Sequence, residues 1–357
     1  MKSTTLILLL LVLAQSDEPL TPVGSPLSHF QAGCDDEHDE KKFAEKACYT
    51  TFDPSQADFG RSYHPPTCDG SLRVTDGQKD IIARAYGRAP EYAKIRLCKL
   101  THLFVTHSSQ GSWSFWEGQD RPPGTGVYIG ISEWRLEGGR SIAEGENEIT
   151  DELVSVDGDN GSDGPRLPRL RTSARDPALA VLSVLAHELG HLLLSDTNAD
   201  GVDAGHPRRK VSDPPRSDCF EHTFLGLSWD AETFHQHMRR WVEFGEQNQN
   251  RRKNSELQFD LKHLRAAIRA DDLVAPSQAI TRVYRSREFV SFFASISPEE
   301  DFVETYKYKV LSDAMRNQAI DLALDGQQTN VLDYVQSGIP ARKVECLREL
   351  GLLTARL

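Results

Sequence analysis

The most informative stretch of the chain is a long apolar run in which polar positions are rare. From Ala178 the sequence reads Ala-Leu-Ala-Val-Leu-Ser-Val-Leu-Ala, and after a short interruption it continues with three leucines from Leu192. Asp176 and Pro177 precede the run as an N-cap and a first helical residue, so the pattern predicts a helix from Pro177 to Asp196. Apolar residues lie nearly all the way round this helix, and we therefore expect it to be buried.

The rest of the chain alternates between helical and strand patterns. Helices are predicted at 75–86, 230–245, 256–271 and 280–293, and strands at 99–106 and 126–132. Residues 137–175 are polar, charged and rich in glycine, which predicts an inserted surface loop or flexible segment. A mixed sheet, a buried helix and a mainly helical C-terminal half together predict an α+β fold with a cleft between the halves.

The first residues predict export. Lys2 is followed by an apolar run at 6–13 and small residues up to Ser16, which is the pattern of a signal peptide over 1–16. We expect cleavage near Ser16 and a secreted or periplasmic protein. The apolar run is too short to span a bilayer, and no later segment predicts a membrane span.

Composition is consistent with a full hydrophobic core and limits the partners. The 357 residues are 38% hydrophobic and 26% charged, with a net charge of −12 that disfavours nucleic acid as a partner. We expect an acidic, cysteine-containing arm at 17–70 and one domain at 71–357. The six cysteines predict up to three disulfides. Six cysteines can pair in about 15 ways, and the sequence does not choose among them.

The interruption of the apolar helix carries the candidate chemistry. It reads His187-Glu188-Leu189-Gly190-His191, and histidines four apart lie on one helical face with imidazoles able to converge on one ion. This HExxH spacing is typical of zinc hydrolases, in which the metal lowers the pKa of a water toward about 7 and the carboxylate takes its proton. The three are the helix's only ionisable groups between the cap and Asp196, so their burial calls for a compensating ligand.

A catalytic zinc needs a third protein ligand. A metzincin continuation after His191 is absent, since the required glycine and histidine places hold Leu194 and Thr197. A thermolysin-like glutamate at the usual short interval is also absent, because the first glutamate after the motif is Glu221. The better candidates are Glu300 and Glu304, which the pattern places one turn apart on a helix.

With this second motif, the chain resembles gluzincin-type zinc metallopeptidases, and more narrowly the lethal-factor-like group, in which HExxH is followed by a helix bearing E-x-F-A-E. Here that helix reads Glu300-Asp301-Phe302-Val303-Glu304, with Val303 in the alanine place. The resemblance implies a zincin-like fold, Glu300 as the third zinc ligand and Glu304 as a buried partner that supports a ligand. It covers two short motifs within residues 187–304.

The chain departs from this family in two ways. Phe293 stands at the place of the tyrosine that helps to stabilise the oxyanion, seven residues before Glu300. Positions 191 and 300 are 109 apart, a long separation that implies an insertion between the two metal-binding helices. Tyr284, Tyr306 and His222 are alternative oxyanion donors.

The role of Glu300 has alternatives. Ser297, Pro298 and Glu300 also form a capping box, in which the carboxylate would bond the start of the helix. The third ligand is then open to Glu304, Glu299, Asp196, His206 or another residue of the insertion.

A second metal site is suggested directly after the apolar helix. Asp196, Asn198 and Asp200 precede Gly201 in a D-x-N-x-D-G pattern, in which oxygen ligands at alternate positions suit calcium (Ca2+). Pro207 occupies the place of the usual bidentate glutamate, so an EF-hand proper is not predicted. A polar loop that ends the helix is the alternative.

These features predict an exported zinc (Zn2+) endopeptidase that acts on a protein or peptide substrate, with zinc held by His187, His191 and Glu300 and with Glu188 as general base. A secreted binding protein on a degenerate zincin scaffold is the first alternative, since Phe293 removes the family's oxyanion donor. An amidase that acts on cell-wall peptides is the second, because it uses the same chemistry.

Overall fold

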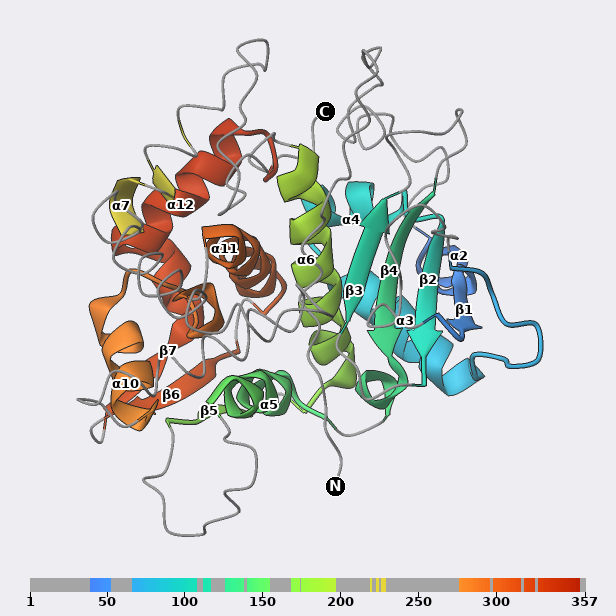
Figure 1. Ribbon diagram of the computed structural model, residues 1–357, viewed down its shortest axis with the longest axis horizontal. Coiled ribbons are helices and arrows are strands. Elements are labelled where there is room, and N and C mark those ends of the chain that lie inside the picture. Colours follow the sequence, from blue (N-terminus) through green and yellow to red (C-terminus); the bar gives the residue numbers. More distant parts are fainter. Residues whose placement is uncertain are drawn as a thin grey trace, which may run out of the picture.

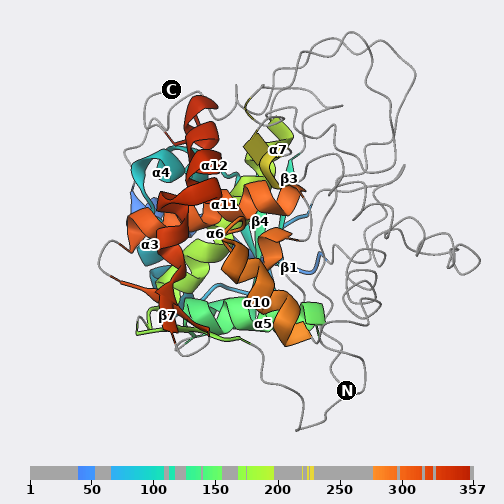
Figure 2. The same cartoon turned by 90° about the vertical axis from the view of Figure 1, so that its left-hand side faces the viewer.

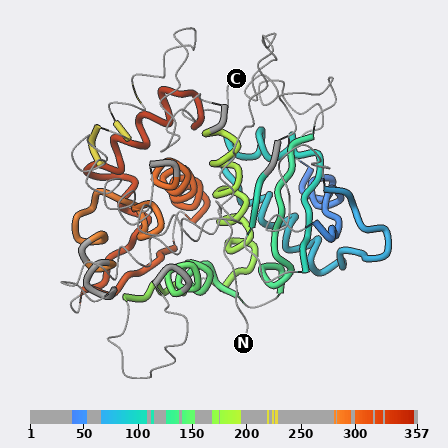
Figure 3. The backbone as a smooth tube through the Cα atoms, viewed as in Figure 1, coloured from blue at the N-terminus to red at the C-terminus, as the bar shows by residue number. Residues whose placement is uncertain are grey.

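The computed structural model describes residues 39–52, 66–107, 112–116, 126–137, 140–154, 168–173, 175–196, 219, 223–224, 226–228, 276–295, 298–315, 318–324 and 327–353. Figure 1 shows a long helix, α6 (Pro177–Asp196), with a four-stranded sheet on one side and a group of helices on the other. The backbone tube in Figure 3 shows that the sheet comes from the N-terminal half of the chain and these helices from the C-terminal half. The predicted α+β class is confirmed.

The four-stranded sheet is mixed. Its order is β1 (Ala47–Thr50), β2 (His102–Thr106), β4 (Val127–Ser132) and β3 (Trp113–Trp116). The first three strands run parallel, whereas β3 pairs antiparallel with β4. The strands predicted at 99–106 and 126–132 are therefore confirmed as β2 and β4.

Strand β4 is buried along its whole length. One face meets the apolar core, and the other is covered at Gly130 by the indole of Trp113. A Cβ atom at Gly130 would lie 2.0 Å from that ring, so only glycine lets β3 place its tryptophan there.

Among the described residues, the helices α2 (Glu40–Glu45), α3 (Asp76–Arg88) and α4 (Glu91–Leu97) belong to the N-terminal part of the chain, as do these strands. Thr75 caps α3 through a capping box with Gln78, which confirms the predicted helix start. Helix α6 lies between α3 and α11 (Pro298–Ala314) in Figure 1, and both helices contact it. Figure 2 views the same arrangement from the side of α11.

Helix α6 has the predicted ends. The Asp176 carboxylate accepts the backbone N–H of Ala178 at 3.0 Å, as an N-cap does. By length and composition the window Pro177–Leu194 is apolar enough to cross a membrane, and 83% of it is buried inside the protein. Its apolar surface thus packs in the core, against α3 on one side and α11 on the other.

The C-terminal half is built around α11, which packs along α6. The other helices that the structure describes in this half are α7 (Gly226–Ser228), α10 (Pro276–Ser286), η5 (Phe293–Ser295), η6 (Val331–Gln336) and α12 (Gly338–Glu349). The helix predicted at 280–293 ends at Ser286, and Phe293 begins a separate short turn. The helices predicted at 230–245 and 256–271 lie outside the described residues.

The prediction of a flexible segment at 137–175 is wrong for two parts of it. Helix α5 (Ile142–Val154) and strand β5 (Leu170–Thr172) form there, and β5 begins a small antiparallel sheet with β6 (Ile320–Leu324) and β7 (Gln327–Asn330). The Asn147 side chain ties them together, because it bonds both the N–H and the C=O of Leu170 at 2.9 Å. The acidic residues and glycines of this segment led its composition to predict a loop in place of the helix.

The predicted boundary between an arm at 17–70 and a domain at 71–357 is also wrong. Strand β1 lies at one edge of the sheet, and its Tyr49 is buried. Phe43 of α2 stacks on Tyr86 of α3 with ring centroids 4.3 Å apart. Residues 39–52 and 66–70 therefore belong to the folded domain, while 17–38 and 53–65 lie outside the described residues.

Disulfides join distant parts of the chain. Cys48 bonds Cys68 across 20 residues, and Cys219 bonds Cys346 across 127 residues. Cys98 is also disulfide-bonded. Such crosslinks are typical of an oxidising, extracellular environment.

Candidate metal centre

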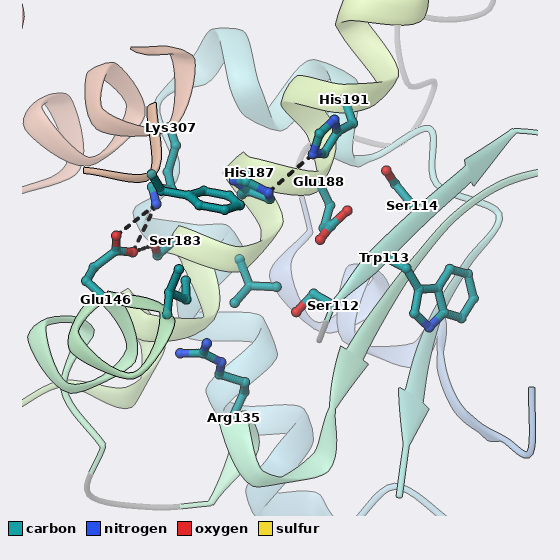
Figure 4. Close-up of a pocket in the computed structure, with 13 residues that line it drawn as sticks. Ser112, Trp113, Ser114, Arg135, Glu146, Ser183, His187, Glu188, His191 and Lys307 are labelled. Carbon is teal, nitrogen blue, oxygen red and sulfur yellow. Dashed lines mark hydrogen bonds and ion pairs between the residues drawn. The ribbon is translucent and has the colours of Figure 1, made fainter. Parts of the chain in front are cut away.

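The two histidines of the HExxH motif converge as the spacing predicts. His187 and His191 project from the same face of α6, and their Nε2 atoms are 3.3 Å apart. Figure 4 shows the two rings facing a common space with Glu188 beside them. Both side chains are largely buried, with 17% and 23% of their surface exposed.

Glu300 completes the group from α11. Its carboxylate oxygens lie 3.4 Å from Nε2 of His191 and 3.7 Å from Nε2 of His187, and the residue is fully buried. Ligand atoms of these three residues all lie within 4.8 Å of one another, close enough to hold one metal ion. The predicted ligand set is thus brought together. Ser297, the other half of the predicted capping box, lies outside the described residues.

Helix α11 can approach α6 this closely because of a glycine inside the motif. A Cβ atom at Gly190 would lie 3.1 Å from Cγ1 and 3.2 Å from Cα of Val303. Since these contacts are tighter than a methyl group accepts without movement, Gly190 sets the distance between the two helices that carry the candidate ligands. Val303, the departure from the alanine of the family pattern, is the residue that fills this space.

Glu304 contacts the side of His187 that faces away from the other two candidate ligands. Its Oε1 lies 2.9 Å from Nδ1 of His187, while its Oε2 accepts a hydrogen bond from Ser291 at 2.6 Å. A carboxylate at Nδ1 fixes the ring so that Nε2 faces the metal position. This supporting role is the one that the family resemblance implies.

A buried lysine extends this arrangement to α5. Lys307 lies 2.6 Å from Oε1 of Glu304 and 3.0 Å from both oxygens of Glu146. Ser183 of α6 also donates to Glu146, at 3.2 Å. Sequence reasoning missed Glu146 and Lys307, although Lys307 follows Glu304 by three residues and therefore lies on the same helix face.

The environment gives the two imidazoles different proton affinities. Burial favours the neutral form of His187, but the Glu304 and Glu300 carboxylates outweigh it and raise its pKa. For His191, burial and the neighbouring His187 lower the pKa to about 3. His191 is therefore a neutral imidazole at physiological pH, which is the form that binds a metal.

Glu188 is buried beside the histidines. Burial raises its pKa to about 7, against the opposing effects of His187 and of a hydrogen bond from Ser114 on β3. A carboxylate with a pKa near neutrality is suited to take and return a proton. Since the residue is only 4% exposed, its anionic form would be stabilised by a nearby cation.

A pocket opens next to these residues. Besides the motif, it is lined by Ser114 from β3, Arg135 from η1 (Glu133–Leu136), Ile149 from α5, and Phe293. The Phe293 ring lies 5.6 Å from the His187 ring, so an apolar edge stands where the family pattern has a tyrosine. Neither Tyr284 nor Tyr306 lines the pocket, and His222 lies outside the described residues.

The other predicted sites fall beyond the described side chains. Asp196 ends α6, but Asn198, Asp200 and His206 lie outside the described residues, as does the side chain of Glu299. One further group of ligand-type residues, Cys48, Cys68 and His102, owes its closeness to the disulfide. Comparison with models of known protein families, with curated proteins and with solved structures found no match.

Proposed function

We propose that the protein is an exported zinc-dependent endopeptidase of the gluzincin type, closest to the lethal-factor-like group. The observation that carries the proposal is the convergence of His187, His191 and the buried Glu300, together with a pocket that both histidines and Glu188 line. Two nitrogen ligands and one carboxylate, with room for a further ligand on the pocket side, are typical of catalytic rather than structural zinc.

The buried charges fit a cation at this position. Glu188 and Glu300 are both buried beside imidazoles, one of which is neutral. A divalent ion there would offset the cost of holding carboxylates away from water. When bound, zinc would supply Lewis acidity that activates a water and polarises a carbonyl.

The protein's own residues perform the remaining steps of the proposed reaction. Glu188 takes a proton from the attacking water and later passes it to the leaving amine, which its pKa of about 7 allows. Ser114 holds this carboxylate through its hydroxyl. Glu304 and Ser291 keep the ring of His187 oriented during the reaction.

An edge strand supports a peptide as the substrate. Among the described strands β3 pairs only with β4. It is the strand of the sheet nearest to α6 (Figure 1), and its residues Trp113 and Ser114 line the pocket. An extended peptide can add to such an edge through backbone hydrogen bonds. The peptide bond would then lie across Glu188, which is held by Ser114 of this same strand.

The decisive experiment combines metal content and turnover. We expect about one zinc per purified mature chain, cleavage of a mixed peptide library, and loss of both when a chelator removes the metal. Glu188→Gln should keep the metal and lose activity, while Glu345→Gln, on the exposed surface of α12, should change neither. A chain that takes up no zinc on reconstitution would refute the proposal.

One alternative function has a specific observation in its favour. Phe293 lines the pocket without a hydroxyl, which is what a binding protein on a degenerate zincin scaffold would show. Full zinc occupancy without cleavage of any peptide would favour this alternative. Cleavage of cell-wall peptides but not of the library would favour the amidase.

A further inference from the structure

A chain of polar contacts runs behind the candidate metal ligands and returns to the helix from which it starts. It links, in order, His187, Glu304, Lys307, Glu146 and Ser183. The last of these precedes the first by four residues, which is about one turn of α6. Figure 4 shows Lys307 and Glu146 meeting beside Ser183 at the wall of the pocket. Helices α5, α6 and α11 thus share one network.

Within this network, one oxygen of Glu304 is shared between a candidate ligand and a cation. Its Oε1 lies 2.9 Å from Nδ1 of His187 and 2.6 Å from Nζ of Lys307. A carboxylate at Nδ1 strengthens Nε2 of the ring as a donor to a metal. An ammonium on the same oxygen opposes the negative charge of that carboxylate. Lys307 therefore weakens the effect of Glu304 on His187.

Glu146 of α5 opposes this effect of Lys307. Both of its oxygens lie 3.0 Å from Nζ, so the ammonium is shared between two carboxylates. Hydroxyls of Ser183 at 3.2 Å and of Tyr308 at 3.5 Å also donate to Glu146. Lys307 is 1% exposed and Glu146 is 7% exposed, and buried charges are screened little by salt. A change of one charge at Glu146 should therefore be felt at His187.

We infer that Lys307 and Glu146 are positioning residues that act through Glu304 to set how strongly His187 binds a metal ion. The juxtaposition that carries the inference is an ammonium between two buried carboxylates, one of which contacts the candidate ligand. The inference rests on the zinc site of the proposed function. It gives a role in that site to α5, which supplies none of the three candidate ligands.

The test measures zinc affinity of the purified mature protein by competition with a chromophoric chelator, together with kcat/KM for the peptide library. Glu146→Gln keeps the length of the side chain and an oxygen that accepts from Lys307, but it removes one negative charge. The ammonium then acts on Glu304 without its counter-charge. We expect zinc affinity to fall by roughly 10-fold, the lower end of the range for groups that support a metal ligand.

The double variant Glu146→Gln with Lys307→Met separates charge from packing. It removes one negative and one positive charge, so the net charge behind His187 returns to that of the wild type. We therefore expect its zinc affinity to lie within about threefold of wild type and above that of Glu146→Gln. A merely structural role predicts the opposite, because the loss of two side chains should weaken the site at least as much as the loss of one. The double variant also leaves neither partner as an unpaired buried charge.

Glu148→Gln and Lys309→Met are the matched controls. Each makes the same substitution on the same helix, two residues away. Glu148 pairs with Arg140, and Lys309 pairs with Asp313, in partly exposed ion pairs away from the pocket lining. We expect both variants to keep the zinc affinity of the wild type.

Two results would overturn the inference: equal zinc affinity of Glu146→Gln and wild type, or a double variant that binds zinc no more tightly than Glu146→Gln. Peptide cleavage by the wild-type protein would leave the proposed function standing in either case. The expected changes in zinc affinity without cleavage of any peptide would support the inference and refute the peptidase function. A wild-type chain that takes up no zinc would overturn both.

Discussion

The ionised form of Glu188 destabilises the folded protein, without metal, by a measurable amount. Its pKa is about 7 in the folded protein against an ordinary value of 4.5. One unit of pKa difference corresponds to about 1.4 kcal/mol, so the anion costs the folded state roughly 3 kcal/mol. The residue is only 4% exposed, and screening by solvent should therefore be small.

The sign of the effect follows from proton binding. The folded state binds the Glu188 proton more tightly than the unfolded state, so stability is lost as pH rises from 4.5 through about 7. Gln does not titrate. We therefore expect the unfolding free energy of Glu188→Gln, relative to wild type, to increase by roughly 3 kcal/mol between about pH 4 and about pH 8.

Urea unfolding in the presence of a chelator, with the disulfides intact, measures this difference directly. The lowered pKa of His191 adds its own pH dependence, but it is present in both proteins and largely cancels in the comparison. Zinc should reduce the difference, because a cation favours the carboxylate. A relative stability that stays constant across this pH range would refute the reasoning.

Two further predictions concern the helices α6 and α11, which carry the candidate ligands. Glu300→Gln should be folded but zinc-poor and inactive, because the ion loses a charged ligand, whereas Glu304→Gln should weaken zinc binding by roughly 10- to 100-fold. Metal titration of both variants checks this, and full occupancy with normal turnover in Glu300→Gln would contradict the ligand assignment. Gly190→Ala should cost roughly 1–3 kcal/mol, since its methyl group would push Val303 of α11 away. Denaturant unfolding and zinc affinity should both show this loss, and unchanged values would contradict the proposed helix spacing.

Local sequence patterns predicted the structure correctly where the interacting residues are close in the sequence. Helix α6 begins at its predicted cap and ends at the predicted residue, because capping and apolar periodicity act within a few residues. The approach of His187 to His191 follows in the same way from one turn of helix. The strands β2 and β4 were also predicted from their local patterns.

The α11 part of the site needed more than local rules. A family resemblance indicated Glu300 and Glu304, since 109 residues separate Glu300 from His191 and no spacing rule spans that length. Packing then brings the two helices together at Gly190, where the absence of a side chain permits the approach. Sequence alone left capping and ligation both open for Glu300.

The network behind the ligands was decided by tertiary structure alone. Lys307 and Glu146 are 161 residues apart and meet at 3.0 Å, and α5 itself arose where composition predicted a flexible loop. The acidic residues before Cys48 likewise led to the prediction of an arm where strand β1 forms. Composition describes how a segment would interact with water, but burial against a distant partner changes that balance, and only the folded chain specifies the partner.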